Sequence, residues 1–212
     1  MGGIIGDDGV NVEMWSPWPE VNWPPTNSNE ELLDMTRPDL PESYRGTLRT
    51  VIRYAVVMAF VGLLVGISFQ ESAKKLTFDD APAGVHLEAL IQLALVHGHV
   101  FVMGVLLPLA LAGALLMARR AGGRDLSPRG LAWLVRGYLP LAAGSLVLHL
   151  YKGYHVLLMA RAGERDFAVI DQAFLGGSHL LRYGVYALIH AGMGVTLGVF
   201  LVLLWRSLGR EN

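Results

Sequence analysis

Four apolar stretches of near-membrane length constrain this chain more than any other feature of its sequence. They cover about residues 52–69, 90–118, 138–160 and 180–205. Each approaches or exceeds the roughly 20 residues that an α-helix needs to cross about 30 Å of hydrocarbon. Isolated strands would leave backbone groups without hydrogen bonds in lipid, so the stretches predict helices. We expect an all-α, polytopic membrane protein: a four-helix up-down bundle in a lipid bilayer.

The composition supports this class and narrows the chemistry. Of the 212 residues, 53% are hydrophobic and 17% are charged, whereas about a quarter of the residues in soluble domains are charged. The net charge of −1 gives no reason to expect a nucleic-acid partner. The absence of cysteine excludes disulfides, iron–sulfur clusters, thiolate metal sites and haem attached through Cys.

Residues 1–45 differ from the rest and predict an extended arm ahead of a transmembrane domain at 46–212. The arm is acidic and rich in Pro and Trp, with little aliphatic content for a core of its own. It is either a disordered tail or a docking arm. In the second interpretation Trp15, Trp18 and Trp23 anchor the chain to other subunits of a membrane complex.

The distribution of Lys and Arg predicts the orientation in the membrane. Eleven of these residues fall on the side that carries both chain ends and the 119–136 loop, and six fall on the other side. The positive-inside rule then places the N- and C-termini in the cytoplasm and the protein in the cytoplasmic (inner) membrane. The loops at 70–85 and 161–179 are expected to face outward.

Five histidines lie on three of the four predicted helices, at similar depth in the outer half of the membrane. They are His97, His99, His149, His155 and His190. Ionisable side chains in a bilayer are costly and usually mark function, and neutral imidazole is a common ligand of haem iron, copper and zinc. The alternative is that each histidine ties helices together by hydrogen bonds. Five at one level favour a cofactor or metal.

Helical spacing sorts the polar side chains further. His97 and His99 are about 200° apart on a regular helix, so they cannot both face one site. His149 and Lys152 share one face of the third helix. A stripe on the fourth helix contains His179, Arg182, Tyr183, Tyr186 and His190. Arg182 and Lys152 either pair with haem propionates or extend toward the outer membrane surface.

Glycines and prolines within the stretches suggest how the helices pack. Gly62 and Gly66, like Gly194 and Gly198, have the spacing of close helix–helix contacts. Pro108 and Pro140 lie inside predicted helices, where neighbouring helices can accommodate a kink.

Two resemblances rest on these residues. His97-Gly98-His99, His149 and His190 resemble the histidine pattern of a bacterial family of four-helix membrane proteins of unknown function, over about residues 52–205. The arm at 1–45, His155 and His179 depart from that pattern. The segment HGHVFVMGVLLPLALAG also resembles the haem-ligating second helix of haem–copper oxidase and nitric oxide reductase subunits. The second resemblance implies haem b.

We therefore predict a membrane protein that binds haem b and transfers electrons, as a subunit of a respiratory-type complex. His99 and His190 are the first ligand candidates, followed by His97, His149 and His155; Arg182, Tyr186 and Lys152 complete the site. No residue is assigned a catalytic role, and Glu88 is the only acid expected near the histidines. One alternative is a copper or zinc site for sensing or transport, formed by His97, His99, His149 and His190. The other is a structural subunit without a cofactor.

Overall fold

The computed structural model describes residues 40–76 and 83–209. Within these residues the chain is helical and contains no strand, which confirms the all-α prediction. Four helical segments are long and apolar enough to span a membrane: Glu42–Ala73, His86–Arg120, Pro128–Arg161 and His179–Ser207. The arm, up to residue 39, lies outside the described residues.

The four segments are built from the following elements. The first is a single helix, α2 (Glu42–Ala73), and the last is α8 (His179–Ser207). The second joins α3 (Ala83–His99), the π-helix η1 (Val100–Leu106) and α4 (Leu107–Arg120). The third joins α5 (Pro128–Ala132), the π-helix η2 (Trp133–Tyr138) and α6 (Leu139–Arg161). Between α6 and α8 lie a short helix, α7 (Phe167–Ala173), and the 3₁₀ turn η3 (Phe174–Gly177).

The helices extend beyond the apolar stretches that predicted them. α2 has 32 residues, a length of about 48 Å at 1.5 Å per residue. It begins at Glu42, directly after Pro41, so the arm boundary expected at residue 45 falls within its first turn. Polar residues continue the helix past the hydrocarbon because backbone hydrogen bonds remain favourable in the headgroup region.

Two π-helices accommodate the two prolines. η1 ends two residues before Pro108, and η2 ends two residues before Pro140. A proline has no N–H and its ring collides with the carbonyl four residues earlier in an α-helix. A wider turn relieves that collision and reassigns the free carbonyls: Leu107 N–H, for example, bonds to the carbonyl of Val102, five residues back. A local change of winding therefore occurs at both prolines.

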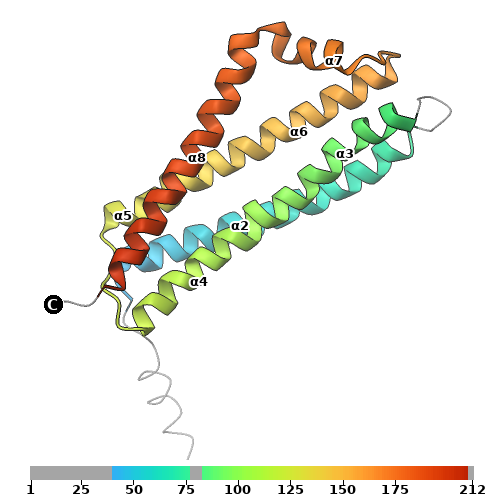
Figure 1. Cartoon of the computed structure of the whole chain (residues 1–212). Helices are drawn as coiled ribbons and strands as arrows, with labels where there is room; N and C mark the ends of the chain where they lie inside the picture. The colour runs from blue at the N-terminus through green and yellow to red at the C-terminus, as the bar shows by residue number, and fades with distance from the viewer. Residues whose placement is uncertain (1–39, 77–82, 210–212) are drawn as a thin grey trace, which may run out of the picture. The chain divides into compact units, whose positions relative to one another are not determined.

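The antiparallel helices create two ends of the bundle, which we name after the short helices there. The α5 end contains the start of α2, residues 119–132 and the end of α8; the α7 end contains the end of α2, the start of α3 and residues 159–182. Figure 1 shows α8 close to α5 and η2 at the α5 end and diverging from α6 toward α7.

Apolar clusters hold the two ends differently. The larger cluster is at the α5 end and includes Tyr138, Leu134 and Phe200, each almost fully buried. A second cluster at the α7 end joins α3, α6 and α7 through Leu93, Leu157 and Ile170, and includes no residue of α8. The fourth helix is therefore packed into the core at one end only.

The two glycine pairs behave differently. A Cβ at Gly62 would lie 2.8 Å from Phe101, and one at Gly66 would lie 2.7 Å from the His97 ring. This contact between the first and second helices needs glycine, as predicted. Gly194 and Gly198 have no atom within 4 Å of an added Cβ. In the described chain the second pair forms no close helix contact.

Candidate functional site

Three of the predicted histidines come together from three helices. The rings of His99 (α3) and His149 (α6) are nearly parallel, with centroids 6.0 Å apart and an interplanar angle of 12°. The ring of His190 (α8) lies 5.4 Å from that of His149 at 65°. His149 is thus the centre of the cluster. The first-ranked pair from the sequence, His99 and His190, forms no ring contact with each other within the described chain.

All three imidazoles use the same nitrogen for the same local contact. Nδ1 lies 2.7 Å from the Leu95 carbonyl oxygen in His99, 2.7 Å from that of Ser145 in His149, and 2.9 Å from that of Tyr186 in His190. A carbonyl oxygen can only accept, so each Nδ1 donates its hydrogen. In neutral imidazole Nε2 then carries the free lone pair, which is the arrangement that prepares a histidine to bind a metal.

The Nε2 atoms of the cluster have few partners of their own. The Nε2 atoms of His99 and His149 form no hydrogen bond in the described part of the chain, and that of His190 lies 3.5 Å from Ser145 Oγ. His99 is exposed at the bundle surface, and the other two are half-buried. The Nε2 lone pairs of His99 and His149 are thus not engaged by the described part of the protein.

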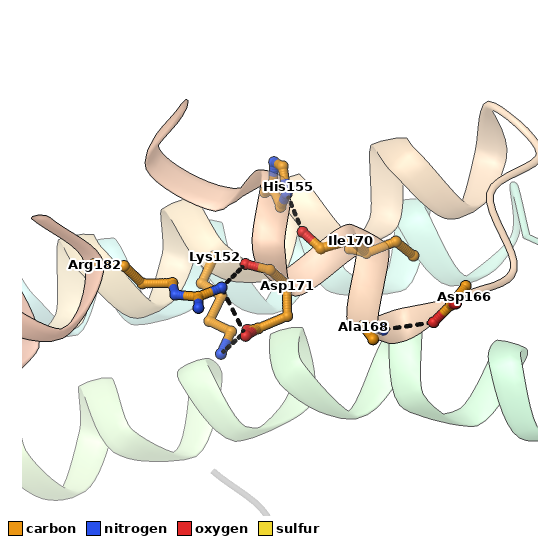
Figure 2. Close-up of polar contacts among 7 residues, drawn as sticks. All are labelled: Lys152, His155, Asp166, Ala168, Ile170, Asp171 and Arg182. Atoms are coloured by element: carbon orange, nitrogen blue, oxygen red, sulfur yellow. Dashed lines mark hydrogen bonds and ion pairs between the residues drawn. The ribbon is translucent and has the colours of Figure 1, made fainter. Parts of the chain in front are cut away.

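The other two predicted ligands are occupied in helix packing. His97 Nδ1 donates to the Gly62 carbonyl oxygen at 3.0 Å, and its ring lies edge-on to Phe101. His155 Nε2 donates to the Ile170 carbonyl oxygen at 2.8 Å and ties α7 to α6 (Figure 2). His97 and His99 therefore face different neighbours, as their spacing predicted.

Tyr186 extends the cluster toward the α7 end. Its ring stacks with His190 at 5.6 Å and meets His149 edge-on at 5.9 Å. Its hydroxyl is buried and has no hydrogen-bond partner in the described chain. The Lys152 ammonium lies 5.8 Å from the centre of the ring. The described protein groups thus leave the polar end of this tyrosine without a hydrogen bond.

Lys152 and Arg182 converge on a carboxylate that the sequence interpretation missed. Asp171, on α7, receives the Lys152 ammonium at 3.1 Å and the Arg182 guanidinium at 3.0 Å. Arg182 also donates to the Asp171 carbonyl (Figure 2). The expectation that Glu88 is the only nearby acid was wrong. The apolar run 167–170, ahead of Asp171, was the available signal of a packed helix in this loop.

Glu88 lies beside this ion cluster. It lines a pocket of about 190 Å³ together with Gln92, Lys152, Phe167 and Asp171. On α8, the outer members of the predicted stripe contact one another: the rings of His179 and Tyr183 are 4.3 Å apart, and Arg182 lies over Tyr183 at 4.9 Å. Only the inner members, Tyr186 and His190, reach the imidazole cluster.

The arrangement brings imidazoles together in pairs around His149. Among the described residues no group of three or more His, Asp or Glu side chains is placed to hold one metal ion. Comparisons with protein-family models, curated proteins and solved structures found no match for this chain.

Proposed function

We propose that this protein binds haem b in the membrane through His149 and one of its two neighbours, His99 or His190, and transfers electrons. The proposal rests on three rings that are each held by their Nδ1–H. The Nε2 atoms of His99 and His149 have no hydrogen-bond partner in the described chain, and that of His190 has only Ser145 Oγ at 3.5 Å. A hydrogen bond from Nδ1–H to a carbonyl oxygen orients a ligand histidine and raises the basicity of its Nε2. His97 and His155 are removed from the ligand set because their contacts join helices.

The number of available donors favours haem over a bare ion. Structural zinc requires four protein ligands, and catalytic zinc requires three. Haem brings four nitrogens of its own and requires only one or two axial ligands from the protein. Pairs of imidazoles therefore suit haem better. A copper or zinc site built from His99, His149 and His190 is the alternative that the experiment below distinguishes, together with a structural subunit that has no cofactor.

The charged residues at the α7 end support the same proposal. Haem carries two propionates, and Lys152 and Arg182 lie on the two helices that supply His149 and His190. Arg182 is only 9% exposed, and its Nε has no partner in the described chain. Asp171 faces both cations and Glu88 lines the same pocket, so the Arg182 Nε is the donor that remains for an acidic group of the ligand. Bound haem would supply one-electron iron chemistry, and these residues would orient its acidic edge.

The cellular setting is part of the proposal. The Lys and Arg distribution favours the cytoplasmic membrane with the α5 end and both termini in the cytoplasm. The imidazole cluster then lies in the outer half of the bilayer. Trp15, Trp18 and Trp23 are proposed to contact other subunits of a respiratory-type complex. Cysteine-accessibility labelling at residues 164 and 209 would test the orientation, since this chain has no native cysteine.

Visible spectra of the protein purified in mild detergent from haem-replete cells test the function. We expect a Soret band, with sharp α and β bands after dithionite reduction. His149→Gly should lose these bands, and added imidazole should restore them by replacing the missing ring. His155→Gln, which keeps a donor for the Ile170 carbonyl, should retain them.

Three results would reject the proposal in different ways. Absence of the bands in the wild-type protein would exclude haem, and elemental analysis would then decide between a metal site and a structural subunit. Retention of the bands in His149→Gly would remove His149 as a ligand. Equal loss in His155→Gln and His149→Gly would show that the spectra report folding rather than ligation.

A further inference from the structure

A second pocket lies at the α5 end, far along the chain from the imidazole cluster. It has a volume of about 370 Å³ and is lined by the first turns of α2 and by α5 with η2. Ser43, Thr47 and Thr50 line it from α2, and Arg129 and Arg136 line it from the other wall. The α2 residues recur every three or four positions and the two arginines are seven positions apart, so each wall is one face of a helix.

The two arginines of this pocket have no partner in the described part of the chain. Neither forms a hydrogen bond or an ion pair there, and both side chains are exposed. Two other arginines at the α5 end do form ion pairs: Arg45 with Glu42, and Arg119 with Asp125. The lining residues include no carboxylate. The pocket is therefore a concentration of uncompensated positive charge.

Three hydroxyl groups on α2 also line the pocket. Thr50 donates its hydroxyl hydrogen to the Gly46 carbonyl, whereas Ser43 and Thr47 form no side-chain hydrogen bond in the described chain and are free to donate. Guanidinium groups and hydroxyls together are the donors that bind phosphate oxygens. Arg129 and Arg136 are seven positions apart, or about 10 Å along the helix, so the arginines can reach two levels of one headgroup.

The position of the pocket favours the phosphate of a lipid headgroup over a soluble phosphate. α2 and the segment Pro128–Arg161 have 32 and 34 residues, or about 48 and 51 Å, which exceeds the roughly 30 Å of hydrocarbon. Their first turns therefore lie at headgroup level. Below the pocket, Val57 and Phe60 of α2 are 58% and 64% exposed and offer an apolar surface for acyl chains. Basic pockets between membrane helices are known sites for anionic lipids.

We propose that this pocket binds the phosphate headgroup of an anionic phospholipid. Arg129 and Arg136 contact the phosphate, Ser43 and Thr47 donate to its oxygens, and the acyl chains follow the exposed face of α2. The proposal concerns a site separate from the haem site and does not depend on it. Arg129 and Arg136 thereby have a proposed role in addition to their contribution to the positive charge of the α5 end.

Gly46 allows a test that leaves the arginines in place. Gly46 lines the pocket, and a Cβ there has no atom within 4 Å, so Gly46→Leu introduces a bulky side chain at the pocket wall. Arg129→Gln with Arg136→Gln removes the charge instead. Gly113→Leu, at another helical glycine with open space around it, controls for the added leucine. Arg120→Gln with Arg206→Gln removes two charges elsewhere at the α5 end.

The measurement compares the thermal unfolding midpoint in detergent with added phosphatidylglycerol, phosphatidylcholine or inorganic phosphate. Native mass spectrometry counts the bound lipid. For the wild type and both controls we expect a larger midpoint rise with phosphatidylglycerol than with phosphatidylcholine. The two pocket variants should lose most of that difference and bind at least threefold less phosphatidylglycerol. Equal binding in pocket variants and controls would overturn the proposal, and an equal rise with inorganic phosphate would show a site for soluble anions instead.

Discussion

The two halves of α8 are held by different forces. Toward the α5 end, Met193, Leu197 and Phe200 pack into the large apolar cluster, and the Cβ position of Gly137 is 2.8 Å from Thr196. Toward the α7 end, Arg182 is the only buried residue before Thr196, and its main contact is the ion pair with Asp171. Close packing of side chains holds the half of α8 toward the α5 end. An ion pair and contacts between aromatic rings hold the half toward the α7 end.

This difference shows which part of a membrane helix can stay loosely packed while the helix keeps its position. Lipid chains are as apolar as leucine, so helices associate in a bilayer through close packing and polar contacts rather than through the hydrophobic effect. Close packing at the α5 end fixes α8, and the other half can then present His190 and Tyr186 without being packed itself. The closely packed end thus fixes the position of a helix whose other half is loosely packed.

Removing Phe200 should have the largest effect, because its side chain is 0% exposed in the packed half. Phe200→Ala deletes a buried ring and leaves a cavity, for which we expect a loss of about 3–5 kcal/mol in the free energy of unfolding. Leu188→Ala is the control in the other half, since Leu188 is 73% exposed; its change should stay within about 0.5 kcal/mol. Chemical denaturation in mixed micelles measures both. Similar losses would contradict the division of α8.

Gly137→Ala tests the fit between η2 and α8 by adding a methyl group to the contact instead of removing a side chain. The added Cβ would lie 2.8 Å from Thr196 Cγ2, and overpacking of this kind destabilises by about 1–3 kcal/mol. Gly144→Ala is the control on the same membrane segment, because its nearest neighbour would be Ile189 at 3.9 Å. The same unfolding assay applies. An unchanged free energy in Gly137→Ala would show that this contact is looser than its geometry implies.

Asp171→Asn should loosen only the half of α8 at the α7 end. It removes the charge that holds Arg182 and Lys152, and because the Asp171 side chain is 43% exposed the loss should be modest, at about 1 kcal/mol. Hydrogen–deuterium exchange should rise in residues 179–190 and stay constant in 196–207. A uniform rise along α8 would mean that the helix responds as one unit. Asp166→Asn, at the N-cap of α7, controls for a general loss of that helix.

The smallest effect is expected at Gly194 and Gly198, where an added Cβ meets no atom. Alanine there should leave the free energy of unfolding unchanged or raise it by up to about 1 kcal/mol through better helix propensity. Alanine at Gly62 or Gly66 should instead destabilise, since both positions are in close contact with the second helix. A clear loss at Gly194 or Gly198 in membranes but not in detergent monomers would reveal a contact with another chain.

The four membrane segments could be predicted because a long apolar run in this composition allows little besides a helix. Their ends could not, since polar residues such as Ser43 and Arg45 continue α2 once the hydrocarbon no longer selects against them. The π-helices also have no pattern of their own in a uniformly apolar sequence, although Pro108 and Pro140 marked the places where regular winding had to change.

The histidines show more clearly which features could not be predicted from the sequence. Depth along the helices predicted a common layer, and the rings of His99, His149 and His190 do meet. Depth could not show which carbonyl each ring contacts. These three rings donate to carbonyls of their own helices, whereas His97 and His155 donate to carbonyls of neighbouring elements. Their roles as haem ligands remain a prediction. Asp171 was missed because an acid in a loop gives no signal of its partners until α7 places it between Lys152 and Arg182.

The wide turns at η1 and η2 have a consequence for how this chain can change. Inserting or deleting one residue in a regular helix rotates everything beyond it by about 100°. A π turn can absorb such a change locally, because it already departs from the regular repeat. η1 begins at Val100, directly after His99, so the angular setting of the imidazole-bearing α3 is separable from that of α4. Single-residue insertions and deletions within 100–106 and 133–138 are therefore the length changes that these two helices can best accommodate.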